Sequence, residues 1–309
     1  MKIGIVGAGA VGSACLTAVI VRRFAREVIV LNRDRKKAHG LVTDVQYGAV
    51  LFPGTEVRDG DYADLDGASV VMITAGVNEK TGGATNRNDP AGRLRLLDTN
   101  VDVYKDIVPR LHAVAPEALV LVVTDPPDPL ADMVRLLGHE RVLSTGTYLD
   151  SLRFRFHLAR RLGVSPESVD ALILGEHGTS EVFLWSSARI GGTPIRELLT
   201  QSAQSWDDFR RQVEHDVRFA NIAIIEGIGA SQHGIGMVSA RIAEMALRDE
   251  HAVIPVGSFN PRYGVTLSLP TVVGREGAIQ ILEPEMSEDE RQALQRGADR
   301  LKALMEKFQ

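Results

Sequence analysis

The chain contains one cysteine, Cys15, among its 309 residues. A single cysteine cannot form a disulfide within the chain, so a disulfide framework is excluded. Its position in an apolar, helix-like segment predicts a small core residue instead. The sequence also lacks internal repeats, low-complexity tracts and an evident linker. We therefore expect two halves that pack as one unit with a cleft between them.

No apolar run is long enough to span a bilayer, and Met1 and Lys2 lead into the first predicted strand without a signal peptide. The formal net charge of −5 favours neither nucleic acid nor an anionic membrane as a partner. No metal site is expected from the scattered histidines, which lack ligand spacing. They are His112, His139, His157, His215 and His251. We expect a cytoplasmic protein.

The chain opens with the sequence KIGIVGAGAVG over residues 2–12. A short apolar run, which predicts a buried strand, leads into a glycine-rich turn and then a helix predicted over 13–23. Gly7 permits a tight bend, Gly9 lets a pyrophosphate approach the backbone, and Gly12 lets helix and strand pack closely. In this context the motif predicts a dinucleotide-binding turn, and the alternative is an ordinary glycine-rich turn.

The first half of the chain alternates apolar runs with helical patterns. Strands are predicted over 27–31, 69–74 and 118–123, and helices over 35–47 and 94–115. Continuous apolar runs between helices are typical of parallel strands that are covered on both faces. We predict an α/β fold in which residues 1–144 form a doubly wound (Rossmann) parallel-sheet domain that binds a dinucleotide.

The pattern changes near residue 145. Helices are predicted over 150–162, 206–227, 235–248 and 288–308, and strands over 169–174, 182–187, 252–256, 264–270 and 278–282. The last three strands look like parts of an antiparallel sheet. We predict that residues 145–309 form an α+β substrate/catalytic domain.

Residues 77–92 form the longest stretch without a helix or strand pattern. They follow a strand end, where doubly wound sheets bind ligands, so a lid over the site is one interpretation. A surface insertion is the other.

A small set of polar residues carries the candidate chemistry. Asp150 and Arg153 are three residues apart at a predicted helix start and share a face. His177 lies between two glycines directly after a strand, where we expect it to be exposed and to titrate near neutral pH. Taken alone, the histidine is also compatible with a structural role, and the Asp–Arg pair with a solvated ion pair.

Together these segments resemble the L-lactate/malate dehydrogenase family, and its bacterial lactate dehydrogenases most closely. The resemblance covers nearly the whole chain. Its main matches are Ala75-Gly76, Arg93-Leu94, Asn100, Thr124, Pro126, Asp128, Leu149-Asp150-Ser151, Arg153-Phe154-Arg155, Gly175-Glu176-His177-Gly178, Ser268-Leu269-Pro270 and Val273-Gly274-Arg275. It implies hydride transfer between NAD or NADP and a small 2-keto or 2-hydroxy acid, in a homodimer or homotetramer.

The resemblance also implies roles for individual residues. His177 would exchange a proton with the substrate, and Asp150 would hydrogen-bond its other ring nitrogen. Arg153 would hold the substrate carboxylate, and Arg93 would polarise the substrate carbonyl as the loop closes. The cofactor would contact Gly7, Gly9, Val11, Gly12, Asn32, Arg33, Ala75, Gly76, Asn100, Thr124 and Asp125.

Some positions depart from the family pattern. Asn32 stands where an acidic residue is expected on the adenosine ribose, with Arg33 and Arg35 after it. One hypothesis is that NADPH is accepted, because no carboxylate repels its 2′-phosphate; the other is that Asn32 hydrogen-bonds the ribose and NADH works normally. The loop before Arg93 is longer by about eight residues by comparison with the family, and Glu79 falls near its substrate-selecting position. Arg87, within the insertion, either binds a second anionic group of the substrate or is a solvated lid charge.

Two further departures concern the reacting centre. Asp125 replaces the family's asparagine before the proline; an ionised carboxylate cannot donate a hydrogen bond, and it favours a protonated His177. Ser231 replaces a threonine of the substrate pocket and leaves more room.

The leading interpretation is an NAD(P)-dependent L-2-hydroxy acid dehydrogenase of the lactate type. One alternative is a reductase for a bulkier or doubly anionic 2-keto acid, including malate- or phosphonopyruvate-type substrates. Another is a nucleotide-binding protein that has lost catalysis. An NAD-dependent glycosidase would need a cysteine-containing metal site, which Cys15 does not offer.

Overall fold

The computed structural model describes residues 1–89, 91–200 and 205–308, so Pro90 of the predicted loop lies outside the described residues. In this part of the chain a mixed sheet has the strand order β14-β13-β12-β6-β5-β4-β1-β2-β3. Its parallel strands are β1 (Lys2–Val6), β2 (Glu27–Leu31), β3 (Glu56–Asp59), β4 (Val70–Ile73), β5 (Leu119–Val122) and β6 (Val142–Ser144). Their order, 3-2-1-4-5-6, is that of a doubly wound dinucleotide-binding sheet, as predicted.

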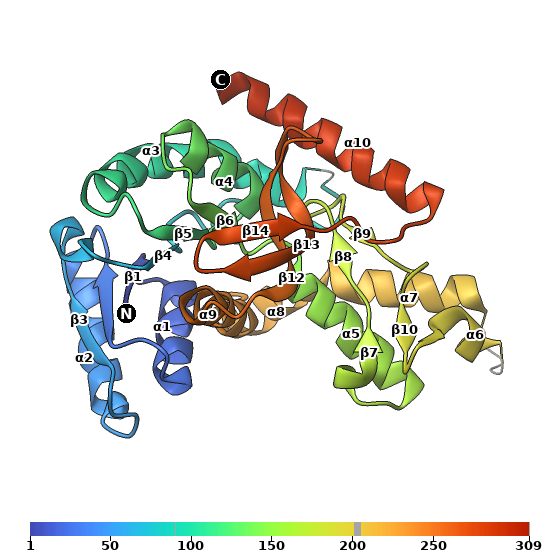
Figure 1. Ribbon diagram of the computed structural model, residues 1–309, viewed down its shortest axis with the longest axis horizontal. Helices are drawn as coiled ribbons and strands as arrows, with labels where there is room; N and C mark the ends of the chain where they lie inside the picture. The colour runs from blue at the N-terminus through green and yellow to red at the C-terminus, as the bar shows by residue number, and fades with distance from the viewer. Residues whose placement is uncertain (90, 201–204, 309) are drawn as a thin grey trace.

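Helices cover both faces of the parallel strands (Figure 1). One face carries α1 (Ala10–Arg22), α2 (Arg35–Ala49) and α9 (His233–Arg248), and the other carries α3 (Leu97–Val114) and α4 (Pro127–Leu136). Side chains of a strand alternate between the faces, so Val28 and Val30 join the first core while Ile29 and Leu31 join the second. Cys15 is fully buried in the first core, as the sequence predicts.

Three antiparallel strands extend this sheet. They are β12 (Ala252–Asn260), β13 (Val265–Gly274) and β14 (Gly277–Ile281). β12 joins β6 through the pairing of Gly257 with Ser144. The predicted antiparallel strands therefore continue the sheet of the N-terminal half across residue 145.

The remaining elements surround the far end of this sheet (Figure 1). They are α5 (Tyr148–Leu162), β7 (Val169–Asp170), β8 (Ile173–Leu174), β9 (Val182–Phe183), β10 (Arg189–Ile190), β11 (Thr193–Pro194), α6 (Ile195–Leu199), α7 (Trp206–Arg218), α8 (Ala220–Ile228) and α10 (Glu288–Met305). The described part of the chain also has short 3₁₀ turns: η1 (Tyr62–Leu65), which packs near β1 and β2, η2 (Gly92–Leu96), η3 (Pro166–Ser168) and η4 (Glu306–Phe308). Phe154 and Trp185 pack edge to face between α5 and the segment after β9.

Several predicted elements were wrong in detail. The helix predicted over 206–227 is two helices, because the backbone leaves the helical region at Phe219 (φ −103°, ψ 8°). The strands predicted over 169–174 and 182–187 are reduced to β7, β8 and β9, each of two residues. α4 and β3 were not predicted. The prolines at the start of α4 argue against a helix when the sequence is considered alone. Pro127 is nevertheless tolerated, because it occupies the first helical position, where a missing N–H costs nothing.

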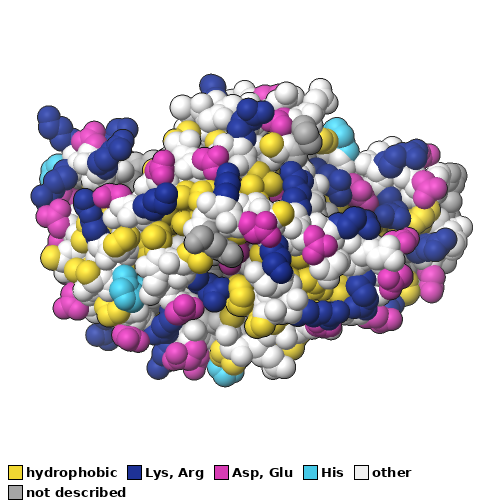
Figure 2. Space-filling model, turned by 90° about the horizontal axis from the view of Figure 1, so that it is seen from above, with side chains coloured by type: hydrophobic (Ala, Val, Ile, Leu, Met, Phe, Trp, Pro, Cys, Tyr) yellow, Lys and Arg dark blue, Asp and Glu magenta, His cyan; other side chains and the backbone are white. Residues whose placement is uncertain are grey.

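The molecular surface carries charges of both signs. Figure 2 shows Lys and Arg side chains interspersed with Asp and Glu over the face seen from above. Among the described residues, no helix combines the length and the apolar character needed to cross a membrane.

Candidate active site

The glycine-rich turn joins β1 to α1 at the carboxyl end of the central strand. Gly7 has a φ of +121°, and a Cβ on Gly12 would lie 1.9 Å from the Gly7 carbonyl oxygen, so both positions require glycine. A Cβ on Gly9 would meet nothing within 4 Å. The helix begins at Ala10, three residues earlier than predicted, with Val11 in its first turn. The open space at Gly9 and the amides at this helix start fit the diphosphate of a dinucleotide.

Asn32 follows β2 beside this turn. Its Oδ1 accepts a hydrogen bond from the backbone N–H of Ala8 (3.1 Å), and its Nδ2 donates to the Asp34 carbonyl (3.0 Å). Arg33 is exposed, and Arg35 pairs with Asp61 at 3.2 Å. The position expected next to the adenosine ribose therefore carries a neutral amide with arginines close by in the chain.

A second group of predicted cofactor residues lies at the ends of β4 and β5. The hydroxyl of Thr124 donates to the Ala75 carbonyl (2.9 Å), and a Cβ on Gly76 would lie 2.4 Å from Thr124 Cγ2. Asn100 of α3 accepts from the N–H of Val77 (2.7 Å) and donates to the Asp125 carbonyl (2.7 Å). These contacts fix the two loops where doubly wound sheets bind their ligand.

His177 lies in the loop after β8 and is only 9% exposed, so the expectation of an exposed histidine was wrong. The ring is covered because Asp150 of α5 accepts a hydrogen bond from Nδ1, while Nη1 of Arg93 lies 2.7 Å from Nε2. A guanidinium only donates, so Nε2 is the acceptor in this arrangement and the ring proton is on Nδ1.

Asp150 is also buried, and it accepts a hydrogen bond from Nη1 of Arg153 (2.9 Å). Although burial alone would raise it, the pKa of Asp150 lies well below its usual range because His177, Arg153 and Arg93 stabilise the carboxylate. The sequence-predicted Asp150, Arg153 and His177 thus come together as one hydrogen-bonded group.

Asp125 faces the same histidine from the end of β5. Its Oδ1 lies 3.6 Å from Nε2 of His177, and its Oδ2 lies 3.4 Å from Nε of Arg93. Burial and the charge of Arg93 act to lower the pKa of His177, but the Asp150 and Asp125 carboxylates outweigh them, so the pKa lies above its usual value. The two carboxylates therefore favour the imidazolium, which forms when Arg93 moves off Nε2, because both ring nitrogens then carry a proton.

Glu79, at the start of the long loop, is a second carboxylate on Arg93. Its Oε1 lies 3.3 Å from Nε of Arg93 and accepts a hydrogen bond from Nδ2 of Asn221 (2.9 Å). Burial and the neighbouring Asp125 raise the pKa of Glu79 above its usual value. Arg93 is therefore held between two carboxylates and the histidine.

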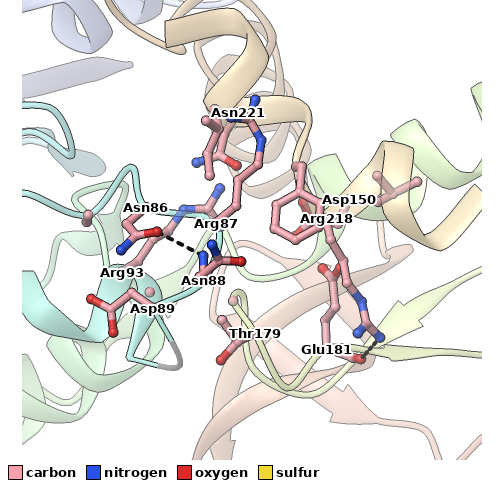
Figure 3. Close-up of a pocket in the computed structure, with 16 residues that line it drawn as sticks. Asn86, Arg87, Asn88, Asp89, Arg93, Asp150, Thr179, Glu181, Arg218 and Asn221 are labelled. Atoms are coloured by element: carbon pink, nitrogen blue, oxygen red, sulfur yellow. Dashed lines mark hydrogen bonds and ion pairs between the residues drawn. The ribbon is translucent and has the colours of Figure 1, made fainter. Parts of the chain in front are cut away.

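A cavity of about 220 Å³ adjoins this group, and residues of the long loop form part of its lining (Figure 3). Its polar lining includes Asn86, Arg87, Asn88, Asp89, Arg93, Asp150, Thr179, Glu181, Arg218 and Asn221. Arg87 does not approach the histidine; it forms a two-pronged ion pair with Glu226 of α8, at 2.7 and 2.8 Å. Ser231 lies half-buried between α8 and α9 and does not line the cavity.

Sequence reasoning did not assign roles to two buried acids near the site. Glu181 lines the cavity beside Arg218, and burial and Asp150 raise its pKa to about 8. Asp128 accepts a hydrogen bond from the backbone N–H of His177 (2.8 Å). Asp128 meets the histidine only in the folded chain, and Glu181, although it follows His177 closely in sequence, is brought beside Arg218 only there.

Among the described residues, His, Cys, Asp and Glu side chains do not gather in a group that is able to hold a metal ion. The geometry instead offers a paired histidine, two arginines and a dinucleotide-binding turn.

Comparisons with known proteins agree with this geometry. The NAD-binding domain of the lactate/malate dehydrogenases matches residues 1–141, and the alpha/beta C-terminal domain of the same family matches residues 147–309. An L-lactate dehydrogenase of Thermus aquaticus is 42% identical over 98% of this chain and 97% of its own length. An L-lactate dehydrogenase of Deinococcus radiodurans is 38% identical over 100% and 99%, respectively.

The solved structure of the minor L-lactate dehydrogenase of Enterococcus mundtii, in a ligands-bound form, is also similar. It matches with a TM-score of 0.90 and 31% identity, over 100% of this chain and 98% of that chain. Both domain models match, and the relatives align over their full length, so this chain belongs to the lactate/malate dehydrogenase family, with the family's NAD-binding domain at its N-terminus.

Proposed function

We propose that this protein is an NAD-dependent L-2-hydroxy acid dehydrogenase of the lactate type. The observation that carries the proposal is the hydrogen-bonded group of His177, Asp150 and Arg153, with Arg93 on the second ring nitrogen. It combines a proton donor and acceptor with two guanidinium groups, which suits a substrate that has one carboxylate and one reacting oxygen.

When bound, NAD supplies or accepts the hydride at the substrate's second carbon. His177 moves the proton: its Nε2 protonates the carbonyl oxygen in reduction and takes the hydroxyl proton in oxidation. Asp150 fixes the ring and stabilises the imidazolium. Arg153 binds the substrate carboxylate, and Arg93 polarises the carbonyl once it releases Nε2 to the substrate oxygen.

We propose that the cofactor is held by the residues predicted from the sequence, and that NADPH is accepted beside NADH. Gly9 leaves open space for the diphosphate at the start of α1, while Gly7 and Gly12 allow the close approach of β1, α1 and the end of β4 that shapes this turn. Asn32 has no charge to repel a 2′-phosphate, and Arg33 is exposed next to it. The alternative is that the Asn32 amide hydrogen-bonds the ribose and NADH is used alone.

The alternative of a reductase for a bulkier or doubly anionic keto acid is less well supported. Arg87 is engaged by Glu226, and Glu79 adds a negative charge beside Arg93. Both features oppose a second anionic group on the substrate. The relatives from Thermus aquaticus and Deinococcus radiodurans, at 42% and 38% identity, carry the L-lactate dehydrogenase name.

We further propose a cytoplasmic homodimer or homotetramer that acts on a small-molecule 2-keto or 2-hydroxy acid. Apolar side chains stand exposed at the end of α2, with Tyr47 at 77%, Val50 at 78% and Leu51 at 78% exposure. Adjacent exposed apolar groups of this kind suit an interface between copies.

The test is the rate of cofactor oxidation across a panel of 2-keto acids with NADH and with NADPH. The panel contains pyruvate, bulky aliphatic and aromatic keto acids, oxaloacetate and phosphonopyruvate. Pyruvate as the best substrate supports the proposal. Turnover of no panel member, with tight binding of NADH, would refute it and favour a protein that has lost catalysis.

A further inference from the structure

Asp128 is a fully buried carboxylate that no catalytic step uses. Its Oδ2 accepts a hydrogen bond from the backbone N–H of His177 (2.8 Å), and its Oδ1 accepts from the hydroxyl of Ser144 (2.5 Å). Burial raises the pKa of Asp128 to about 7, even though both hydrogen bonds act to lower it. A buried acid of this kind is costly, so its presence at this place needs a structural or functional reason.

The start of α4 and the residues just before it reach His177 at two points. Asp125, just before the helix, faces the ring at Nε2, and Asp128, in its first turn, holds the backbone N–H. The short run from Asp125 to Asp128 therefore contacts both the reactive nitrogen and the main chain of the same residue. Any shift of the loop relative to α4 would change both contacts.

The loop around His177 needs such a restraint. Gly175 has a φ of +85°, and a second glycine, Gly178, follows the histidine, so the local sequence alone fixes the backbone weakly. Gly175 is tied to Ser268 of β13 by two backbone hydrogen bonds, at 2.8 and 2.9 Å. The Asp128 carboxylate is the next anchor along the chain, and it lies at the histidine itself.

The surrounding packing keeps Asp128 in place. A Cβ on Gly257 of β12 would lie 2.4 Å from Asp128 Oδ1 and 2.0 Å from the Ser144 hydroxyl. Gly257 and Ser144 are the residues that pair β12 with β6. Asp128 thus links the His177 loop to the junction between the parallel and antiparallel strands.

We propose that Asp128 is a positioning residue, which holds the His177 main chain so that Nε2 meets the substrate oxygen at the reacting distance. It acts through His177 and does not touch the substrate. The expected fall in kcat rests on the proposed dehydrogenase function, whereas the expected loosening of the His177 main chain does not. A small misplacement of a proton donor lowers turnover more than it weakens binding.

The test compares Asp128→Ala with Asp132→Ala in the full-length protein. Asp132 is a matched control, because it is a buried carboxylate of the same helix that accepts from the N–H (2.9 Å) and hydroxyl (2.6 Å) of Thr266, away from the histidine. Amide hydrogen exchange of residues 175–179 should become roughly ten-fold faster or more in Asp128→Ala only. Its kcat should fall about ten- to hundred-fold, with KM for the keto acid within about three-fold.

Asp128→Asn should keep most of the wild-type exchange protection of residues 175–179 and most of the wild-type kcat, because its amide oxygen still accepts from the His177 N–H. If Asp128→Ala does not fold, Asp128→Ser, whose hydroxyl is too short to bridge both donors, replaces it. Equal exchange and equal kcat in the Asp128 and Asp132 variants would overturn the proposal and leave Asp128 with a packing role. The exchange measurement remains valid if the wild type reduces no keto acid, so the two failures are distinguishable.

Discussion

Oδ1 of Asp125 lies 3.6 Å from Nε2 of His177, the nitrogen that carries the transferred proton in the proposed mechanism. A carboxylate at this distance stabilises the imidazolium and so helps to raise the pKa of His177. Reduction of a keto acid needs the protonated ring, and therefore proceeds at pH values below that pKa. Asp125 extends the range of reduction to higher pH.

Replacing Asp125 with asparagine should shift this range. The Asp125→Asn variant loses the carboxylate charge, so the alkaline limb of the pH profile of pyruvate reduction should move down by roughly half to one pH unit. Below both pKa values the variant should reduce pyruvate faster than the wild type, because the amide is able to donate a hydrogen bond. Steady-state rates between about pH 5 and 10 check this, a range that brackets the titration of a histidine.

The exposed Asp102→Asn variant serves as the control for loss of one negative charge, since Asp102 lies on the surface of α3, where it pairs with Lys105 at 3.5 Å. An unmoved limb in Asp125→Asn would contradict the electrostatic role. A strong loss of rate at every pH would mean that Asp125 serves a substrate other than pyruvate.

Two glycines of the N-terminal turn should respond oppositely to alanine. A Cβ on Gly9 meets nothing within 4 Å, whereas one on Gly12 would lie 1.9 Å from the Gly7 carbonyl oxygen. Gly9→Ala should keep the wild-type Tm but weaken NADH binding by about ten-fold or more, because the methyl group enters the space left for the diphosphate. Gly12→Ala should lower the Tm by several degrees, roughly what a loss of 1–3 kcal/mol causes.

Thermal unfolding and NADH fluorescence titration separate the two effects. A Gly9→Ala variant that binds NADH normally would argue against a diphosphate at this turn. A Gly12→Ala variant with unchanged Tm would mean that α1 shifts freely on β1.

The parallel sheet and its covering helices follow from the sequence because continuous apolar runs and helical periodicity are local signals. Short elements escaped prediction where the local signal is weak or misleading. α4 begins among Pro126, Pro127 and Pro129, and β3 is a four-residue edge strand whose sequence, EVRD, is mostly charged. The continuation of the sheet through Gly257 and Ser144 depends on tertiary pairing, which no local pattern records.

The prediction of the site was limited in the same way, because local sequence patterns do not record tertiary contacts. The group of His177, Asp150 and Arg153 was predicted because motifs along the chain mark each member. The burial of His177, the contact of Asp128 with its main chain and the pairing of Arg87 with Glu226 all arise from residues far apart in sequence. The spacing of residues along the sequence does not predict these long-range contacts.

Cofactor preference should depend on Asn32. The Asn32→Asp variant introduces a carboxylate that repels a 2′-phosphate and accepts from ribose hydroxyls. The ratio of kcat/KM for NADPH to that for NADH should fall by about ten-fold or more, since unfavourable charge pairs cost roughly 1–2 kcal/mol. Asp34→Asn, two residues along, controls for charge changes nearby. An unchanged ratio would indicate that the 2′-position does not face Asn32.

Arg93 and Arg95 offer a matched pair on one turn. Arg93 contacts His177, whereas Arg95 is 55% exposed at its side chain and pairs with Asp89. Arg93→Lys should lower kcat for pyruvate by roughly 10²- to 10³-fold, as for loss of one group that stabilises developing charge. Arg95→Lys should stay within about three-fold of the wild type, because surface pairs contribute little. Equal effects would remove Arg93 from the mechanism.

The ion pair of Arg87 with Glu226 joins the long loop to α8 and so holds the loop residues that line the cavity. If this is its role, Arg87→Glu and Glu226→Arg should each change kcat and KM together, by roughly two- to ten-fold, because an exposed pair stabilises closure only modestly. The double variant should return toward the wild type, since it restores the pair with reversed polarity.

The charge-swapped double variant also tests the other interpretation of Arg87, as a residue that binds the substrate. If Arg87 binds an anionic group of the substrate, the double variant stays as impaired as Arg87→Glu, because the restored pair does not return a positive charge to the loop. Measurements of kcat and KM at about 50 mM and about 500 mM salt add a second criterion. Closure through an exposed ion pair weakens with salt in the wild type and in the double variant, whereas the single variants place like charges opposite each other and should show the reverse dependence.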